Sequence, residues 1–277
     1  MMGNQVAIIG HGFVGRATER LLQKSPNIGR IFIQDPKYDL VPKHGPKTLK
    51  RISPDEWDLI KYAFICVPTP LEHDVSILDY DYDGQNKFDM SCIEEAIKDI
   101  PNNVQIVIRS TVGPDNLKPD WIHMPEFLRE RHWEEDIEDV SIPIVIGCSY
   151  DEPLLDWFLD RNVICVEPKE AAMYKLSRNA MLAAKVTLTN YIFDVCNEYD
   201  VSYDNVKSML SQYGNLGDSH WDVPGPDGEF GFGGTCFPKD LNSLIVQMES
   251  HGVNADMLKE VWKYNEQIRK VIDWPVT

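Results

Sequence analysis

The stretch Val6-Ala-Ile-Ile-Gly10-His-Gly-Phe-Val-Gly15 decides the fold of this chain. Four apolar residues, typical of a strand covered on both faces, run directly into glycines spaced Gly-x-Gly-x-x-Gly. Between a strand and a helix, such glycines permit a tight turn, let backbone approach a pyrophosphate and allow close helix packing. The alternative is a glycine turn needed for packing alone. The stretch predicts a dinucleotide-binding turn formed by Gly10, Gly12, Phe13, Val14 and Gly15.

A carboxylate follows at the distance that such a turn requires. Asp35 stands twenty residues after Gly15, at the end of the next predicted strand. A carboxylate there accepts hydrogen bonds from ribose hydroxyls and repels a 2′-phosphate, which predicts NAD as the cofactor. Lys37 leaves NADP open, and the alternative for Asp35 is a turn residue before Pro36.

Short apolar runs rich in β-branched residues alternate with amphipathic stretches from residue 5 to about residue 166. This is the rhythm of strand–helix–strand units. We therefore predict an α/β fold with a Rossmann-type doubly wound parallel sheet, forming an NAD-binding domain over residues 1–166. The expected strands are Gln5–Ile9, Arg30–Gln34, Tyr62–Val67, Val104–Ile108, Ile142–Ile146 and Val163–Val166.

Two polar segments follow expected strands and so fall on the carboxyl edge of the sheet, where such sheets bind ligands. Either segment alone would be an ordinary loop cap, because serine, threonine and proline are common in turns. Their shared position assigns to the cofactor site Val67, Pro68, Thr69, Ser110 and Thr111.

The pattern becomes helical from residue 167. No glycine or proline stands between Lys169 and Tyr213, and apolar residues recur at spacings of three, four and seven: Met173, Leu176, Ala180, Ala184, Tyr191 and Val195. A helix of about 30 residues would be roughly 45 Å long, enough to span domains or a dimer interface. Residues 167–277 are thus expected to form an all-helical domain with a long central helix. Lys175 and Asn179, four residues apart, share a face separate from the stripe of Met173, Leu176 and Ala180.

The segment Gly231-Phe-Gly-Gly-Thr-Cys-Phe-Pro-Lys-Asp240 places a thiol after three glycines and before a helix expected from about Asp240. Backbone in such a loop can approach a substrate closely. A cation or a helix N-terminus favours a reactive thiolate, and Lys239 and the helix start could supply both. The alternative is a buried, inert cysteine.

Composition limits the class of protein. A chain of 277 residues accommodates two domains, and its formal charge of −17 makes nucleic acid a poor partner. Six cysteines without a Cys-x-x-Cys pair indicate neither a disulfide framework nor a zinc site and fit a reducing compartment. Without a leader or a bilayer-spanning apolar run, the expected location is the cytoplasm, away from membranes.

These motifs resemble the UDP-glucose/GDP-mannose 6-dehydrogenase family. The resemblance also takes in Pro125–Glu130 and Lys175–Lys185, and runs from about residue 5 to Gln267. It implies two successive NAD-dependent oxidations at C6 of a nucleotide sugar, which consume one water and release two NADH. UDP-glucose, oxidised to UDP-glucuronate, is the expected substrate, and a homodimer is expected.

The resemblance also implies roles. Cys236 matches the nucleophile that forms a thiohemiacetal and then a thioester, and Lys175 and Asn179 match the donors to the developing oxyanions. Asp240 and Thr111 match the residues that hold the hydrolytic water, Glu126 an acid–base carboxylate, and Glu130 a position near the nicotinamide. The implied substrate-binding residues are Glu126, Phe127, Leu128, Lys175, Asn179, Phe230, Gly233 and Cys236.

The chain departs from the family pattern at Met124, where most members have asparagine, and at Arg131, where most have glycine. The family usually continues into a third, nucleotide-binding domain, so a compact form lacking that domain is expected here. Two other readings stay open: a non-catalytic NAD-binding or dimerising subunit that needs a partner, and a single-step dehydrogenase of the 6-phosphogluconate or hydroxyacid type.

Overall fold

The structure is a computed structural model that describes residues 3–36, 47–49, 51–70, 88–129, 132–212 and 214–274. These residues form two compact units, each described here by itself. The first unit comprises the described residues up to Lys175 and contains the sheet; the second comprises the described residues from Leu176 onward. The change from one unit to the other falls inside the long helix α5 (Pro168–Glu198).

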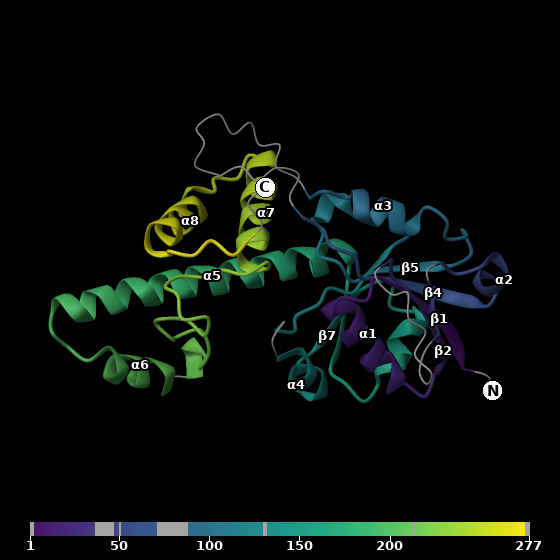
Figure 1. Ribbon diagram of the computed structural model, residues 1–277, viewed down its shortest axis with the longest axis horizontal. Coiled ribbons are helices and arrows are strands. Elements are labelled where there is room, and N and C mark those ends of the chain that lie inside the picture. Colours follow the sequence, from purple (N-terminus) through teal and green to yellow (C-terminus); the bar gives the residue numbers. More distant parts are fainter. Residues whose placement is uncertain are drawn as a thin grey trace. The chain divides into compact units, whose positions relative to one another are not determined.

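Among the described residues, eight strands form one sheet in the order β3-β2-β1-β4-β5-β6-β7-β8 (Figure 1). All six expected strands occur, and neighbours pair in parallel except β6 with β7, which are antiparallel. Two further strands, of three and two residues, are too short for their periodicity to be visible in the sequence. The bounds are β1 Asn4–Ile9, β2 Ile28–Gln34, β3 Lys47–Leu49, β4 Ile60–Ile65, β5 Gln105–Ile108, β6 Ile122–His123, β7 Ile144–Gly147 and β8 Val163–Val166.

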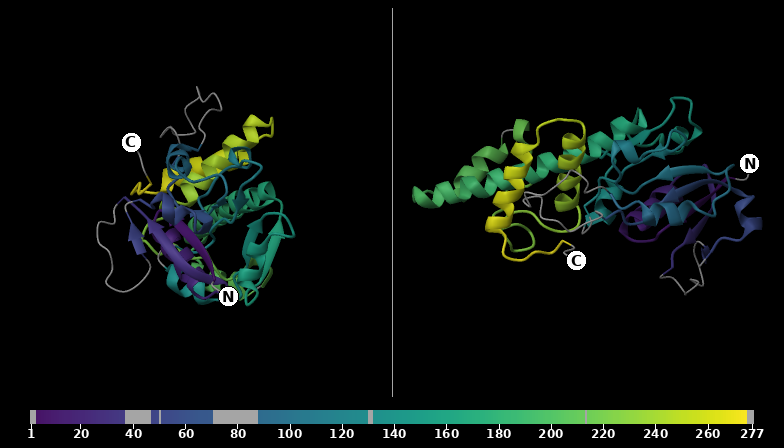
Figure 2. Two further views of the ribbon diagram at one scale, coloured as in Figure 1. Left: turned by 90° about the vertical axis from the view of Figure 1, so that its right-hand side faces the viewer. Right: turned by 90° about the horizontal axis from the view of Figure 1, so that it is seen from above.

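Alternate residues of each central strand enter two separate hydrophobic cores. In β1, Val6 and Ile8 face the core shared with Leu22 of α1 (Phe13–Gln23), and Ala7 and Ile9 face the other core. That second core includes side chains of α2 (Pro54–Trp57) and α3 (Ser91–Ile97). Helices therefore cover both faces of the sheet, as Figure 2 shows, and the predicted doubly wound Rossmann-type fold is confirmed.

The long central helix is also confirmed: α5 spans 31 residues without interruption. It ends where Asp200 adopts a positive φ of 51°, a left-handed conformation that closes helices. Further helices are α4 (Trp133–Glu138), α6 (Tyr203–Gln212), α7 (Phe237–Ser250) and α8 (Asp256–Ile268). No helix within the described ranges has the length and apolar character needed to cross a bilayer.

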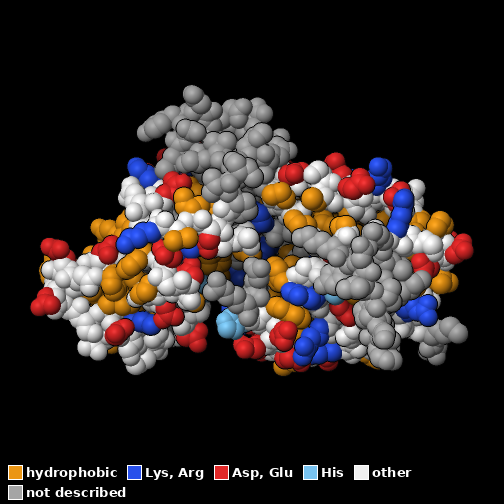
Figure 3. Space-filling view, viewed as in Figure 1, with side chains coloured by type: hydrophobic (Ala, Val, Ile, Leu, Met, Phe, Trp, Pro, Cys, Tyr) orange, Lys and Arg blue, Asp and Glu red, His pale blue; other side chains and the backbone are white. Residues whose placement is uncertain are grey.

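The apolar stripe expected along α5 does not form one buried face. Leu176 and Ala180 are buried, but Met173, Tyr191 and Val195 are exposed. Lys175 and Asn179 are buried as well as Leu176 and Ala180, so the face that carries the polar pair is covered and is not a solvated surface. Figure 3 shows exposed hydrophobic side chains over the part of the second unit that contains α5.

Candidate active site

The glycine turn has the geometry that the sequence predicts. Gly10 has a φ of +88°, and a Cβ on it would lie 2.7 Å from the carbonyl oxygen of Cys66. A Cβ on Gly15 would lie 2.2 Å from the carbonyl oxygen of Gly10, so α1 packs against the turn through a hydrogen-only side chain. A Cβ on Gly12, at the N-cap of α1, would meet no neighbouring atom of the described residues within 4 Å. Packing therefore explains why glycine is needed at positions 10 and 15. At Gly12 packing does not require glycine, and space is left open at the helix N-terminus.

Asp35 directly follows β2, and its Oδ2 accepts a hydrogen bond of 2.6 Å from the backbone N–H of His11 in this turn. The His11 ring lies 2.7 Å from Glu19 of α1, measured from Nε2 to Oε2. The carboxylate of Asp35 is thus fixed directly against the first turn of the glycine motif. Lys37, the other residue expected here, lies outside the described residues.

The loops after β4 and β5 are joined at the carboxyl edge of the sheet. Ser110 Oγ donates to the carbonyl of Val67 at 2.6 Å, and Thr69 Oγ1 donates to the carbonyl of Thr111 at 2.7 Å. Pro68 between them is exposed. The structure therefore brings together the two polar segments that the sequence assigned to the cofactor site.

Glu126 takes part in a buried polar cluster with Arg109, which is paired with it through Nη2. The guanidinium also donates to Thr18 Oγ1 at 3.0 Å and to the carbonyl of Met124 at 2.9 Å. The other oxygen of Glu126 accepts from the backbone N–H groups of Phe127 and Leu128. Met124, at which the sequence departs from the family pattern, takes part in this cluster through its backbone carbonyl, which accepts from Arg109. Glu130 lies outside the described residues.

Lys175, the last residue of the first unit, is 7% exposed, and its Nζ lies 5.5 Å from the centre of the Phe127 ring. His123 in the same unit is fully buried. Burial, followed by the positive charges of Arg109 and Lys175, lowers the pKa of His123 to about 3. The first unit thus contains a neutral imidazole close to two cations. His123 was not among the residues predicted from the sequence.

In the second unit, Asp240 connects the predicted catalytic residues. Its Oδ2 accepts a hydrogen bond of 2.6 Å from Nδ2 of Asn179, and Lys239 Nζ lies 2.7 Å from its Oδ1. Asp240 is 1% exposed, so this carboxylate is held away from water. Lys239 is engaged with the carboxylate, whereas the sequence placed it as a candidate activator of the thiol.

Cys236 stands at the N-cap of α7, which begins at Phe237 and not near Asp240 as expected. The thiol is half-buried, 3.8 Å from the hydroxyl of Thr235. The carbonyl of Cys236 accepts the N–H of Asp240 at 2.8 Å. The predicted nucleophile, Cys236, and the buried carboxylate of Asp240 therefore lie within the first turn of the same helix.

The glycines before Cys236 differ in their surroundings. A Cβ on Gly233 would lie 2.1 Å from Nη2 of Arg269, so a guanidinium covers that position. A Cβ on Gly234, which has a φ of +76°, would meet no atom within 4 Å in the part of the chain that the structure describes. Phe230 contributes its carbonyl to Arg269 and packs its ring on Phe193. Another molecule could therefore approach the backbone closely at Gly234. At Gly233 the side chain of Arg269 already occupies that space.

The UDP-glucose/GDP-mannose dehydrogenase family, central domain, matches residues 169–267, a span that includes the Asn179–Asp240 contact and Cys236. Residues 169–267 therefore belong to the central domain of the UDP-glucose/GDP-mannose dehydrogenase family.

Relatives of known name agree with this membership. The chain is 28% identical over 229 residues to the UDP-glucose 6-dehydrogenase of Rickettsia felis, which covers 74% of this chain and 47% of that protein. It is 30% identical over 241 residues to the GDP-mannose 6-dehydrogenase of Pseudomonas aeruginosa, covering 76% of this chain and 52% of that protein. The chain thus spans about half the length of these two relatives.

A solved structure of a UDP-glucose dehydrogenase from Pyrobaculum islandicum superposes with a TM-score of 0.76 at 23% identity. The match covers 96% of this chain and 68% of that chain. At this identity the likeness establishes a shared fold. This likeness extends over both units of the chain and not just over residues 169–267.

The predicted catalytic residues divide between the two units: Thr111, Glu126 and Lys175 lie in the first, and Asn179, Cys236 and Asp240 in the second. Several residues that organise these groups were not predicted from the sequence: Arg109, His123, Asn190, Asn265, Arg269 and Asp273. A basic residue directly after an apolar strand could have signalled Arg109. The others act through contacts between residues far apart in sequence, for which one sequence carries no signal.

Proposed function

We propose that this chain oxidises the C6 alcohol of a nucleotide sugar to the carboxylate, with Cys236 as covalent nucleophile and NAD as the electron acceptor. The observation that carries the proposal is the placement of Cys236 at the N-cap of α7, one turn from the buried Asn179–Asp240–Lys239 cluster. A helix N-terminus favours negative charge, so it suits a thiolate and the oxyanions formed on its substrate.

The chemistry balances as a four-electron oxidation: one alcohol, one water and two NAD⁺ give one carboxylate, two NADH and protons. The cofactor supplies a hydride acceptor twice. Between the two oxidations, the Cys236 sulfur attacks the aldehyde carbon and forms a thiohemiacetal, which retains the intermediate on the protein. After the second oxidation the product is a thioester, and water cleaves its carbon–sulfur bond to regenerate the thiol.

The side chains of this chain have distinct parts in that scheme. The amide of Asn179 and the ammonium of Lys175 are donors suited to an oxyanion. Asp240 orients the Asn179 amide, which donates to it at 2.6 Å, and with Thr111 it is assigned to the hydrolytic water. Glu126 is assigned to proton transfer during thioester hydrolysis. Its pairing with Arg109 means that this contact must open or be shared for Glu126 to accept a proton.

The glycine turn fits a dinucleotide. Gly12 leaves open space at the N-terminus of α1, where backbone N–H groups attract a pyrophosphate, and a side chain there would fill that space. Asp35, held beside the turn by the N–H of His11, is the residue that would bind the adenosine ribose. Because a carboxylate repels a 2′-phosphate, we assign NAD in preference to NADP.

UDP-glucose is the proposed substrate, since the similar proteins carry UDP-glucose or GDP-mannose dehydrogenase names. The proposed domains are the NAD-binding residues 1–166 and the helical residues 167–277. A homodimer is proposed as well, because exposed apolar side chains on α5, among them Met181, Leu188 and Tyr191, form the kind of surface that subunit contacts cover.

Stoichiometry tests the proposal. The chain is incubated with NAD and, in turn, UDP-glucose, GDP-mannose and UDP-N-acetylhexosamines, and NADH is counted per sugar consumed. We expect two NADH per UDP-glucose and none with Cys236→Ala. Cys92→Ala, at an exposed cysteine of the first unit, is the matched control and should retain two.

Other results would point elsewhere. One NADH per sugar, with Cys236→Ala as active as the wild type, would refute the covalent scheme and favour a single-step dehydrogenase. Measurable NAD binding without turnover would favour a non-catalytic subunit that needs a partner.

A further inference from the structure

Side chains from three distant segments hold the backbone of the glycine loop before Cys236. The N–H of Gly231 donates to Asn190 Oδ1 of α5 at 3.1 Å, and the N–H of Phe232 donates to Asn265 Oδ1 of α8 at 2.8 Å. The N–H of Gly234 donates to Asp273 Oδ1 at 2.9 Å. Three of the four amides from Gly231 to Gly234 thus have a side-chain acceptor, and of these three Asp273 holds the one closest in sequence to Cys236.

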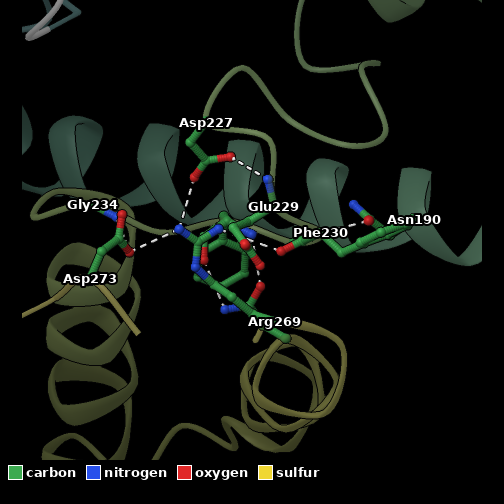
Figure 4. A network of polar contacts seen from close by, with 10 residues as sticks. Asn190, Asp227, Glu229, Phe230, Gly234, Arg269 and Asp273 are labelled. Atoms are coloured by element: carbon green, nitrogen blue, oxygen red, sulfur yellow. Dashed lines mark hydrogen bonds and ion pairs between the residues drawn. The ribbon is translucent and has the colours of Figure 1, made fainter. Parts of the chain in front are cut away.

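Arg269 connects the acidic groups around this loop (Figure 4). Its Nη2 lies 2.8 Å from Asp227 Oδ2 and 2.9 Å from Asp273 Oδ1, and its Nη1 donates to the carbonyl of Phe230 at 3.4 Å. The Arg269 side chain is 1% exposed, whereas those of Asp227 and Asp273 are 26% and 36% exposed. A buried guanidinium with two carboxylate partners fixes both partners in place, because its planar fork restricts their geometry.

The same guanidinium lies against the backbone of the loop. A Cβ on Gly233 would meet Nη2 and Cζ of Arg269 at 2.1 and 2.3 Å, and Asp273 Oδ1 at 2.3 Å. Glycine at this position is therefore required by Arg269 and Asp273. One oxygen, Asp273 Oδ1, receives both Arg269 Nη2 and the N–H of Gly234, so the ion pair and the loop share an atom.

We infer that Arg269 and Asp273 are positioning residues for the nucleophile. By fixing the peptide unit between Gly233 and Gly234, they set the direction in which the chain enters Thr235 and Cys236, and hence the orientation of the thiol at the start of α7. Neither touches the thiol in the contacts described. Both residues lie beyond the span 169–267 that the family model matches. The inference rests on the proposed role of Cys236 as nucleophile.

Asp273→Ala in the full chain tests this inference, because Asp273 is partly exposed and its removal leaves Arg269 paired with Asp227. We expect amide hydrogen exchange in a peptide covering 231–240 to rise at least tenfold, with exchange in α5 unchanged. With UDP-glucose, kcat should fall by about tenfold to a hundredfold with KM within twofold, as expected when a reacting group is misplaced by about an ångström.

Two further variants separate positioning from general stability. Asp273→Asn keeps an oxygen that accepts the Gly234 N–H, and should restore both loop protection and kcat to within about threefold of wild type. Glu249→Gln removes an ion pair with Lys259 that joins α7 to α8 at comparable exposure, and does not contact the loop. It should leave loop exchange and kcat at wild-type values.

The inference is overturned if Asp273→Ala leaves loop exchange and kcat unchanged, or if Glu249→Gln alters both as strongly. A rise in KM with kcat retained would also overturn it, since that pattern indicates lost substrate binding. If the wild-type chain shows no turnover at all, the proposed function fails, and the exchange measurement still decides whether Asp273 holds the loop.

Discussion

Asn179 Nδ2 donates a 2.6 Å hydrogen bond to Asp240 Oδ2, linking the middle of α5 to the first turn of α7 inside the second unit. Asn179→Ala removes this donor and leaves a carboxylate that is 1% exposed with one partner fewer. A buried acceptor left short of a partner costs about 1–3 kcal/mol. We expect the free energy of unfolding, measured in urea, to fall by about 2 kcal/mol.

The control for this variant is Asn197→Ala, at an exposed asparagine near the end of the same helix. It should change the free energy of unfolding by less than about 0.5 kcal/mol. Turnover provides the second measurement: if Asn179 donates to an oxyanion, kcat in Asn179→Ala falls by roughly a hundredfold. Equal stability of the two variants would contradict the structural part of the prediction.

His123 gives the first unit a predictable pH dependence. Within the described residues, neither of its ring nitrogens has a hydrogen-bond partner, and burial, followed by the charges of Arg109 and Lys175, lowers its pKa to about 3. The unfolded chain binds a proton at this residue below about pH 6.5, and the folded chain does not until about pH 3. Stability from a neutral His123 is therefore lost as the pH falls from about 6.5 toward 3.

His123→Leu removes this titration while keeping a buried side chain of similar size. The unfolding free energy of the variant minus that of the wild type should rise as the pH is lowered from 7 to 4, by up to about 1.4 kcal/mol per pH unit. His132→Leu, at an exposed histidine of the same unit, is the control and should show no such trend. A difference independent of pH would contradict this, because it would mean that His123 takes up its proton over the same pH range in the folded and the unfolded chain.

The parts of the fold that the sequence predicted are those specified by neighbouring residues. Val6–Gly15 predicted β1, the turn and α1 correctly, because strand periodicity and glycine spacing are local. The strand Ile122–His123 was missed, since two residues show no period. The burial of Lys175 was also missed, because helix periodicity does not reveal what packs against a lysine.

The glycine loop combines features that the local sequence specifies with contacts that only the tertiary structure specifies. Gly231–Asp240 indicated a reactive thiol from local composition. The structure places Cys236 at the N-cap of a helix that begins at Phe237, three residues before the expected start at about Asp240. The residues that hold the loop, Asn265 and Asp273, are 33 and 39 positions away from the amides they accept. Contacts at that separation depend on tertiary packing, so a single sequence does not specify them.

The pairing of Arg109 with Glu126 predicts a large stability effect. Their side chains are 3% and 11% exposed, and Arg109→Met would leave the Glu126 carboxylate without its guanidinium. Breaking a buried pair from one side costs about 3–5 kcal/mol, measured as the free energy of unfolding in urea. Arg20→Met, which breaks an exposed pair with Glu138, is the matched control and should have no measurable effect.

A second substitution identifies the cause of that loss. Arg109→Met combined with Glu126→Gln removes the uncompensated charge and should recover part of the lost free energy of unfolding. If the double variant is as unstable as Arg109→Met, the contacts of Arg109 with Thr18 and the carbonyl of Met124 account for the cost instead of the charge.

Two glycines of the turn, Gly12 and Gly15, are expected to differ in how much each contributes to the stability of the fold. Gly12 has a φ of −66° and open space where a Cβ would stand, whereas a Cβ on Gly15 would lie 2.2 Å from the Gly10 carbonyl oxygen. Gly12→Ala should therefore change the free energy of unfolding by no more than about 1 kcal/mol, the balance of backbone entropy and N-cap preference. Gly15→Ala should cost several times that amount, because backbone atoms must move.

The proposed cofactor site adds a second expectation. If a pyrophosphate approaches the backbone at Gly12, a methyl group there blocks it, and the Kd for NAD, measured by isothermal titration calorimetry, should rise at least tenfold in Gly12→Ala. Gly214→Ala, at another glycine with open space, is the control and should bind NAD with the wild-type Kd. Wild-type NAD affinity in a folded Gly12→Ala would show that the turn serves packing alone, because the open space at Gly12 would then have no ligand to admit.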